Sequence, residues 1–205
     1  MALSALVKIS GVNNLSEARY CAGMGAGILG FCPEPENPDF VDIKKFREIT
    51  GWVQGVKFAG EFYNSSLESV IRIDREYHFD YLQINRPEFI GALKDSHKPI
   101  IFTIDLSTYE NWEGAKSVMR QLLSGVDFFL IEGRAPSDIL LKEICESSGD
   151  FRIMLGTGIT KDSLTKMITQ CRFSGFAFKG SGEIKPGYLE PGELGEMMEL
   201  LETDV

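Results

Sequence analysis

Histidine is scarce in this sequence: the chain of 205 residues contains only His78 and His97. A zinc site built on histidines, or a Ser-His-Asp triad, therefore has little material to draw on. Basic residues are also in the minority, with 21 Lys and Arg against 30 Asp and Glu, and the net charge of -9 argues against a nucleic-acid-binding surface. We also find no signal-peptide pattern and no apolar run long enough to span a membrane.

Cysteine is limited to four widely spaced residues, Cys21, Cys32, Cys145 and Cys171, with no CxxC pair among them. This spacing predicts reduced thiols in the core of a cytoplasmic protein. The composition, with 43% hydrophobic and 25% charged residues, suits one globular domain that spans residues 1–205. Nothing in the sequence gives a reason to expect a metal ion or another cofactor.

Short apolar segments alternate with helical patterns along the whole chain. We predict strands at 7–12, 27–31, 56–62, 81–85, 99–105, 127–132, 152–156 and 175–179. We predict helices at 15–24, 41–50, 67–77, 87–93, 112–123, 137–147, 161–170 and 192–201, with caps at Asn14 or Ser16, Ser65, Ser137 and Thr160. This alternation predicts a single-domain α/β fold, a (β/α)8 TIM barrel; the rival architecture is an open doubly wound sheet.

Polar residues gather where the predicted strands end, which is where this barrel places its active site. They are Lys8 and Ser10, Glu61 and Asn64, Gln83 and Asn85, Thr103 and Asp105, and Glu132. The loops after strands seven and eight are rich in glycine, with Gly156, Thr157 and Gly158 in one and Gly180, Ser181 and Gly182 in the other. Both loops together favour a phosphate site, although two simple connecting turns remain the alternative.

The segments "VKISGVNNLSEARYCAGMGAGILGF", "GEFYNSSLESV" and "KGSGEIKPG" resemble phosphoribosylanthranilate isomerase, a barrel enzyme of tryptophan biosynthesis. The resemblance implies an isomerase of the aldose–ketose type that needs no cofactor. Its reaction is an Amadori rearrangement, in which an acid protonates a ring oxygen and a base removes the C2′ proton. The expected partner is a small phosphorylated metabolite, without nucleic acid or membrane, and the protein is expected to be a monomer or a homodimer.

Several positions depart from the pattern that the resemblance implies. The catalytic cysteine of the family falls on Ser10, whose hydroxyl is a far weaker acid than a thiol. The catalytic aspartate falls on Glu132, and the arginine that meets the anthranilate carboxylate falls on Asp39. Further departures are Asn85 and Arg86 for His-Gly, and Ala177 and Lys179 for an aspartate and a serine.

These departures predict that the family reaction is impaired or redirected. Ser10 could instead bind backbone at a strand end, and Glu132 could be paired with Lys8 or Lys179. Three functions therefore stay open: an isomerase with an altered base, an enzyme for another phosphorylated metabolite that uses Glu132 with Glu61 or Asp105, and a non-catalytic binding protein.

Overall fold

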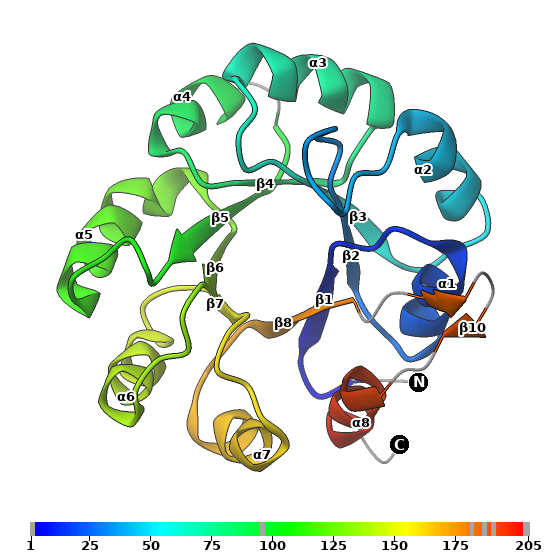
Figure 1. Ribbon diagram of the computed structural model, residues 1–205. Helices are drawn as coiled ribbons and strands as arrows, with labels where there is room; N and C mark the ends of the chain where they lie inside the picture. Colours follow the sequence, from blue (N-terminus) through cyan, green and yellow to red (C-terminus); the bar gives the residue numbers. More distant parts are fainter. Residues whose placement is uncertain (1–2, 95–96, 181–182, 186–187, 190–191, 203–205) are drawn as a thin grey trace.

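The computed structural model describes residues 3–94, 97–180, 183–185, 188–189 and 192–202. Eight parallel strands form a closed barrel in sequence order, which confirms the predicted fold (Figure 1). The strands are β1 Leu6–Ser10, β2 Ile28–Phe31, β3 Lys57–Glu61, β4 Tyr81–Ile84, β5 Ile100–Asp105, β6 Phe128–Glu132, β7 Ile153–Leu155 and β8 Gly175–Lys179. Pairing of β1 with β8 closes the ring and places Ser10 opposite Lys179.

The helices surround the barrel and cover the outer face of its strands (Figure 1). They are α1 Leu15–Gly23, α2 Ile43–Thr50, α3 Leu67–Tyr77, α4 Ile90–Leu93, α5 Trp112–Leu122, α6 Asp138–Ser147, α7 Lys161–Gln170 and α8 Gly192–Leu200, with short 3-10 turns at Pro87–Phe89 and Leu123–Gly125. A two-stranded antiparallel sheet that the sequence did not predict lies between β8 and α8. Its strands are β9 Glu183–Lys185 and β10 Tyr188–Leu189.

Most helix starts lie where the sequence predicted them. Asn14, Ser137 and Thr160 each accept a backbone N–H of the first turn of α1, α6 and α7. The predicted cap Ser65 is wrong by one residue, because Ser66 accepts the N–H of Ser69 at the start of α3. The Ser65 N–H instead donates to the buried carboxylate of Glu34 on the loop after β2, so the helix begins one residue later.

The barrel interior has an apolar part and, toward the carboxyl ends of the strands, a polar part. The inner cluster consists of Ile28, Ala59, Ile101, Phe128, Leu130, Met154 and Ala177. The outer, larger cluster lies between strands and helices and includes the predicted core residues Met197 and Met198. On the inner face, Lys8 and Glu61 are almost fully buried toward the carboxyl ends of the strands. The barrel therefore supports a polar group of side chains on an apolar base.

The prediction of four reduced thiols is wrong for two of them. Cys145 of α6 and Cys171, which follows α7, form a disulfide across a sequence separation of 26 residues. Neighbouring outer helices bring the two residues together, and linear spacing without a CxxC motif does not reveal this. Cys21 and Cys32 are free and buried, as predicted. Among the described helices, none has both the length and the apolar character that a membrane crossing requires.

Candidate functional site

A cavity of about 420 Å³ opens at the carboxyl ends of the barrel strands. Its described lining consists of Ser10, Gly11, Cys32, Asn37, Pro38, Asp39, Glu61, Tyr63, Glu132, Gly133, Gly156, Ala177, Phe178 and Lys179. Six of the site residues predicted from sequence are therefore brought together here: Ser10, Asp39, Glu61, Glu132, Gly156 and Lys179. The position agrees with the active-site end of this fold.

Lys8, Ser10 and Glu61 form one connected polar group at the floor of the cavity. The fully buried Lys8 Nζ forms an ion pair with Glu61 Oε1 and lies 2.6 Å from Ser10 Oγ. The second oxygen of Glu61 accepts the Gly11 N–H at 3.0 Å. A Cβ at Gly30 of β2 would collide with the Glu61 carboxylate, so this glycine provides the space that the pair needs. The buried charges are thus compensated within the protein.

This geometry defines how Ser10 can act. A lysine ammonium has three donors and no acceptor, so Ser10 Oγ accepts from Lys8. The hydroxyl hydrogen of Ser10 then remains available for an acceptor in the cavity. The predicted alternative was that Ser10 forms hydrogen bonds only with backbone groups. The structure instead shows its hydroxyl accepting from the Lys8 side chain. The Ser10 hydroxyl can therefore donate a hydrogen bond into the cavity, and its role toward a ligand remains a prediction.

Glu132 ends β6 and reaches the same cavity. Burial raises its pKa to about 7; nearby Lys8 lowers the value, while Glu61 and Asp105 raise it. A carboxyl group with such a pKa is present in both protonation states at neutral pH and can give or take a proton. The alternative in which Glu132 pairs with Lys8 or Lys179 is not observed among the described residues, where these lysines pair with Glu61 and Asp39.

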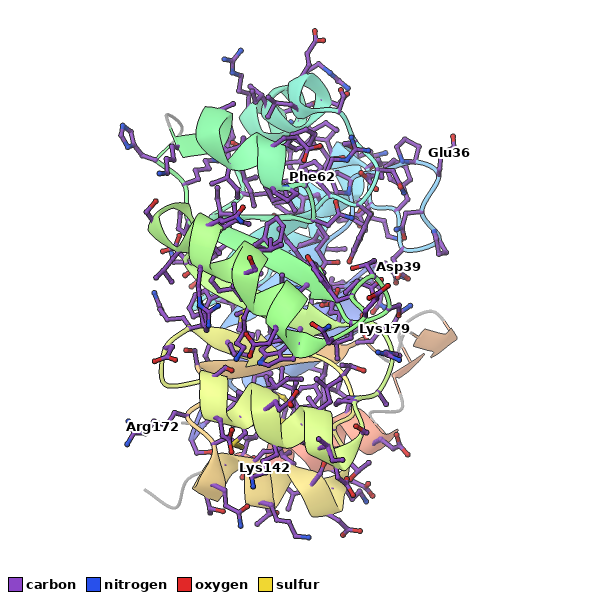
Figure 2. All side chains as sticks on the ribbon, turned by 90° about the vertical axis from the view of Figure 1, so that its left-hand side faces the viewer. Glu36, Asp39, Phe62, Lys142, Arg172 and Lys179 are labelled. Carbon is purple, nitrogen blue, oxygen red and sulfur yellow. A yellow bond between two sulfur atoms is a disulfide. The ribbon has the colours of Figure 1, made fainter. Side chains whose placement is uncertain are left out.

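An ion pair crosses the rim of the cavity. Lys179 Nζ at the end of β8 lies 3.3 Å from Asp39 Oδ2 on the loop after β2, and Figure 2 shows the two side chains next to each other at one end of the barrel. Asp39 is 24% exposed and Lys179 is 74% exposed. The carboxylate is therefore part of the cavity wall, whereas the ammonium extends largely into solvent.

Two further polar side chains point into the barrel beside this group. Gln83 lies in register with Glu61 on β3, and Thr103 lies in register with Leu130 of the inner cluster. The side-chain amide of Gln83 and the hydroxyl of Thr103 are buried and have no hydrogen-bond partner among the described protein groups. Buried polar groups of this kind are usually satisfied by water or by a ligand. They extend the polar region below the cavity toward β4 and β5.

Other predicted residues lie close to the cavity but do not contribute to its described lining. Asn85 Nδ2 donates to the Tyr63 carbonyl at 3.2 Å, and Asp105 Oδ1 accepts the Ser107 N–H at 2.8 Å. Thr157 Oγ1 donates to the Gly133 carbonyl at 2.8 Å. These contacts shape the loops around the site. The roles that the sequence suggested for Asn85 and Asp105 in a substrate pocket remain predictions.

Several residues of the cavity lining were not among those predicted from the sequence. Tyr63 continues the two-residue alternation of β3 beyond Glu61, and that signal could have identified it. Asn37 and Pro38 come from the long loop after β2, where no periodicity indicates which side chains turn inward. Cys32 was assigned to the core, and it is both buried and in the cavity wall.

The proposed phosphate loops are only partly within the described chain. Ser181 and Gly182 lie outside the described residues. The Gly156 N–H donates to the Ile131 carbonyl at 2.8 Å and the Gly180 N–H donates to the Ser10 carbonyl at 2.9 Å, so neither amide is available to an anion. The Gly158 backbone has a φ of +69°, which a glycine readily adopts. The phosphate site predicted for residues 156–158 and 180–182 remains a prediction.

Known proteins resemble this chain in both sequence and fold. N-(5′-phosphoribosyl)anthranilate isomerase of Sulfurihydrogenibium sp. (strain YO3AOP1) is 22% identical over 205 residues, which cover 97% of this chain and 99% of that protein. The protein of the same name from Rubrobacter xylanophilus is 34% identical over 85 residues, or 41% of each chain. The chain resembles phosphoribosylanthranilate isomerases. No family model matches it.

Solved structures of phosphoribosylanthranilate isomerases share the fold. The crystal structure from Thermus thermophilus has a TM-score of 0.75 at 22% identity, and the alignment covers 96% of this chain and 98% of that one. A structure in complex with reduced 1-(o-carboxyphenylamino)-1-deoxyribulose 5-phosphate has a TM-score of 0.77 at 18% identity, with the same coverage. The protein is thus a phosphoribosylanthranilate isomerase-like barrel, and the predicted resemblance is confirmed.

Proposed function

We propose that this protein is an isomerase that carries out an Amadori rearrangement of a phosphorylated ribosylamine, with Glu132 as its proton-transferring residue. The observation that carries the proposal is the position of Glu132, at the end of β6 in the cavity that Ser10 also lines. The resemblance to proteins named for this reaction supports it. Residues that meet in one cavity define the function more closely than the fold does.

Glu132 can serve both proton transfers in turn. In its protonated form it donates to the ring oxygen, the bond from C1′ to that oxygen breaks, and the nitrogen lone pair forms a C1′=N iminium. The resulting Glu132 carboxylate removes the C2′ proton, and the electron pair forms a C1′=C2′ bond while the nitrogen becomes neutral. The enolamine gives the ketose when C1′ gains a proton and the 2′-hydroxyl loses one. Glu132 ends the cycle protonated, and no oxidant is needed.

The floor of the cavity supports these steps. Ser10 donates its hydroxyl hydrogen to the 2′-oxygen of the ligand and so holds the C2′–H bond in position for proton removal by Glu132, while the electron pair of that bond moves toward the iminium nitrogen. Lys8 strengthens this donor because its ammonium already donates to Ser10 Oγ at 2.6 Å. Glu61 holds Lys8 in place and keeps the buried charge compensated. Lys8 and Glu61 are positioning residues in this mechanism, and Ser10 and Glu132 contact the ligand.

The phosphate end of the ligand is assigned to the loops after β7 and β8. Gly156 is in the cavity wall, and the positive φ of Gly158 turns the chain at the start of the loop before α7. The buried Glu17 carboxylate lies against Gly180, so the anion would sit on the side of residues 157–158. A cytoplasmic location fits a biosynthetic isomerase of this kind.

The test is a single-turnover assay with phosphoribosylanthranilate and excess enzyme, which follows the loss of substrate fluorescence. Because a general acid–base contributes roughly 10²–10⁴-fold, we expect Glu132→Gln to reduce the rate by that amount. Ser10→Cys is expected not to raise the rate, since a thiol is a weak donor. The exposed Glu48 of α2 provides a matched control, and Glu48→Gln should leave the rate unchanged.

Two results would contradict the proposal. One is the absence of turnover in the wild-type protein under these conditions. The other is a Glu132→Gln variant that reacts as fast as the wild type. A large increase in Ser10→Cys would show instead that residue 10 is the base, and Glu132 would then keep only the role of acid.

A further inference from the structure

The charges around the cavity are already compensated by one another. Among the described residues that line it or lie directly beneath it, the cations are Lys8 and Lys179. Lys8 pairs with Glu61 and Lys179 pairs with Asp39, so each cation faces a carboxylate of the protein. Glu132 adds a further carboxyl group to the wall. Among the described residues, the cavity wall around Asp39 and Glu61 therefore contains no cation that lacks a carboxylate partner.

Asp39 is held in the cavity wall by its surroundings. Its backbone N–H donates to Asn37 Oδ1 at 2.9 Å, which fixes the turn of the loop after β2. Its carboxylate lies directly against the backbone of Gly11, where a side chain would leave only 2.9 Å between the Cβ and Oδ2. The positive φ of Gly11, +69°, also favours glycine at this position. Asp39 is therefore placed at the tip of β1, beside Ser10.

A carboxylate in this place selects among ligands by charge. It can accept hydrogen bonds from an N–H or O–H group in addition to its contact with Lys179. A carboxylate brought into the cavity by a ligand would face Asp39 and Glu61, and no described lining residue supplies it with an unpaired cation. Like charges at short range are repulsive. The exposed Lys179 ammonium is already shared with Asp39 and is screened by solvent.

We propose that the ligand of this site is a phosphorylated ribosylamine whose amine substituent ends in a neutral, N–H-donating group such as a carboxamide, and that Asp39 accepts from this group. This inference rests on the proposed function and narrows its substrate class. A ligand with a carboxylate at the same position is expected to bind more weakly and to turn over slowly, but still measurably, when the enzyme is in excess.

Calorimetric titration with two matched probes tests this specificity. One probe is reduced 1-(o-carboxyphenylamino)-1-deoxyribulose 5-phosphate, and the other is the same compound with a carboxamide in place of the carboxylate. We expect the wild-type protein to bind the carboxamide at least about tenfold more tightly at low salt. Asp39→Asn should reduce this ratio by strengthening the carboxylate probe and weakening the carboxamide probe.

Glu36 provides the matched control, because it carries the same charge on the same loop and points away from the barrel (Figure 2). Glu36→Gln should leave the ratio of the two affinities unchanged. Tighter binding of the carboxylate probe by the wild type would overturn the inference. An affinity ratio of the two probes that Asp39→Asn does not alter would overturn it as well. Either result would leave the proposed function standing. Binding of neither probe would overturn both.

Discussion

Glu132 makes the stability of this protein depend on pH in a direction opposite to that of an ordinary paired carboxylate. Its pKa is raised from the ordinary value of 4.5 to about 7, chiefly by burial at the end of β6. Between these pH values the folded protein keeps a proton that the unfolded chain has lost. Stability is therefore highest at low pH with respect to this group, and it falls as pH rises from about 4.5 through 7.

The size of the effect follows from the same values. A pKa that folding moves from 4.5 to about 7 corresponds to about 3 kcal/mol of stability, which is lost once Glu132 is ionised. This is a large share of the roughly 5–15 kcal/mol that stabilises a typical domain. Glu132→Gln has nearly the same shape and cannot ionise, so the variant should not show this loss.

Urea denaturation of both proteins at intervals between pH 4 and pH 9 measures the difference. The free energy of unfolding of Glu132→Gln relative to wild type should rise by up to about 3 kcal/mol across this range, with most of the change between pH 5 and 8. The Glu48→Gln control removes an exposed carboxyl group of α2 and should show no comparable change. A difference between wild type and Glu132→Gln that stays constant with pH would refute the assignment of a raised pKa.

Two further predictions concern stability. Glu61→Gln leaves the buried Lys8 ammonium without its ion pair and should lower the free energy of unfolding by about 3–5 kcal/mol in urea denaturation at pH 7. Combining Glu61→Gln with Lys8→Met should recover much of this loss. A Glu61→Gln variant as stable as wild type would show that the pair is not needed. Reduction of the Cys145–Cys171 disulfide, which spans 26 residues, should lower the free energy of unfolding by about 3 kcal/mol. The denatured protein should show two reactive thiols without reductant and four with it. Four thiols without reductant would contradict the bond.

The order of strands and helices could be predicted from the sequence alone. Eight apolar segments of strand length, each followed by a helical pattern, favour parallel pairing with right-handed crossovers, and the count of eight favoured the closed barrel over an open sheet. The two-residue period within each strand also placed Ser10, Glu61 and Glu132 on the inner face at the active-site end. These features depend on local pattern, and the sequence carries that pattern directly.

The pairing of charges was decided only by the tertiary structure. Lys8 and Glu61 are 53 residues apart, and Lys179 meets Asp39 only because β8 closes on β1 beside the loop after β2. The Cys145–Cys171 bond likewise needs two neighbouring outer helices. Sequence can indicate which residues reach the end of the barrel, because alternation is local. It cannot choose partners among the side chains that meet there, because distances across a closed sheet are set by its register and closure.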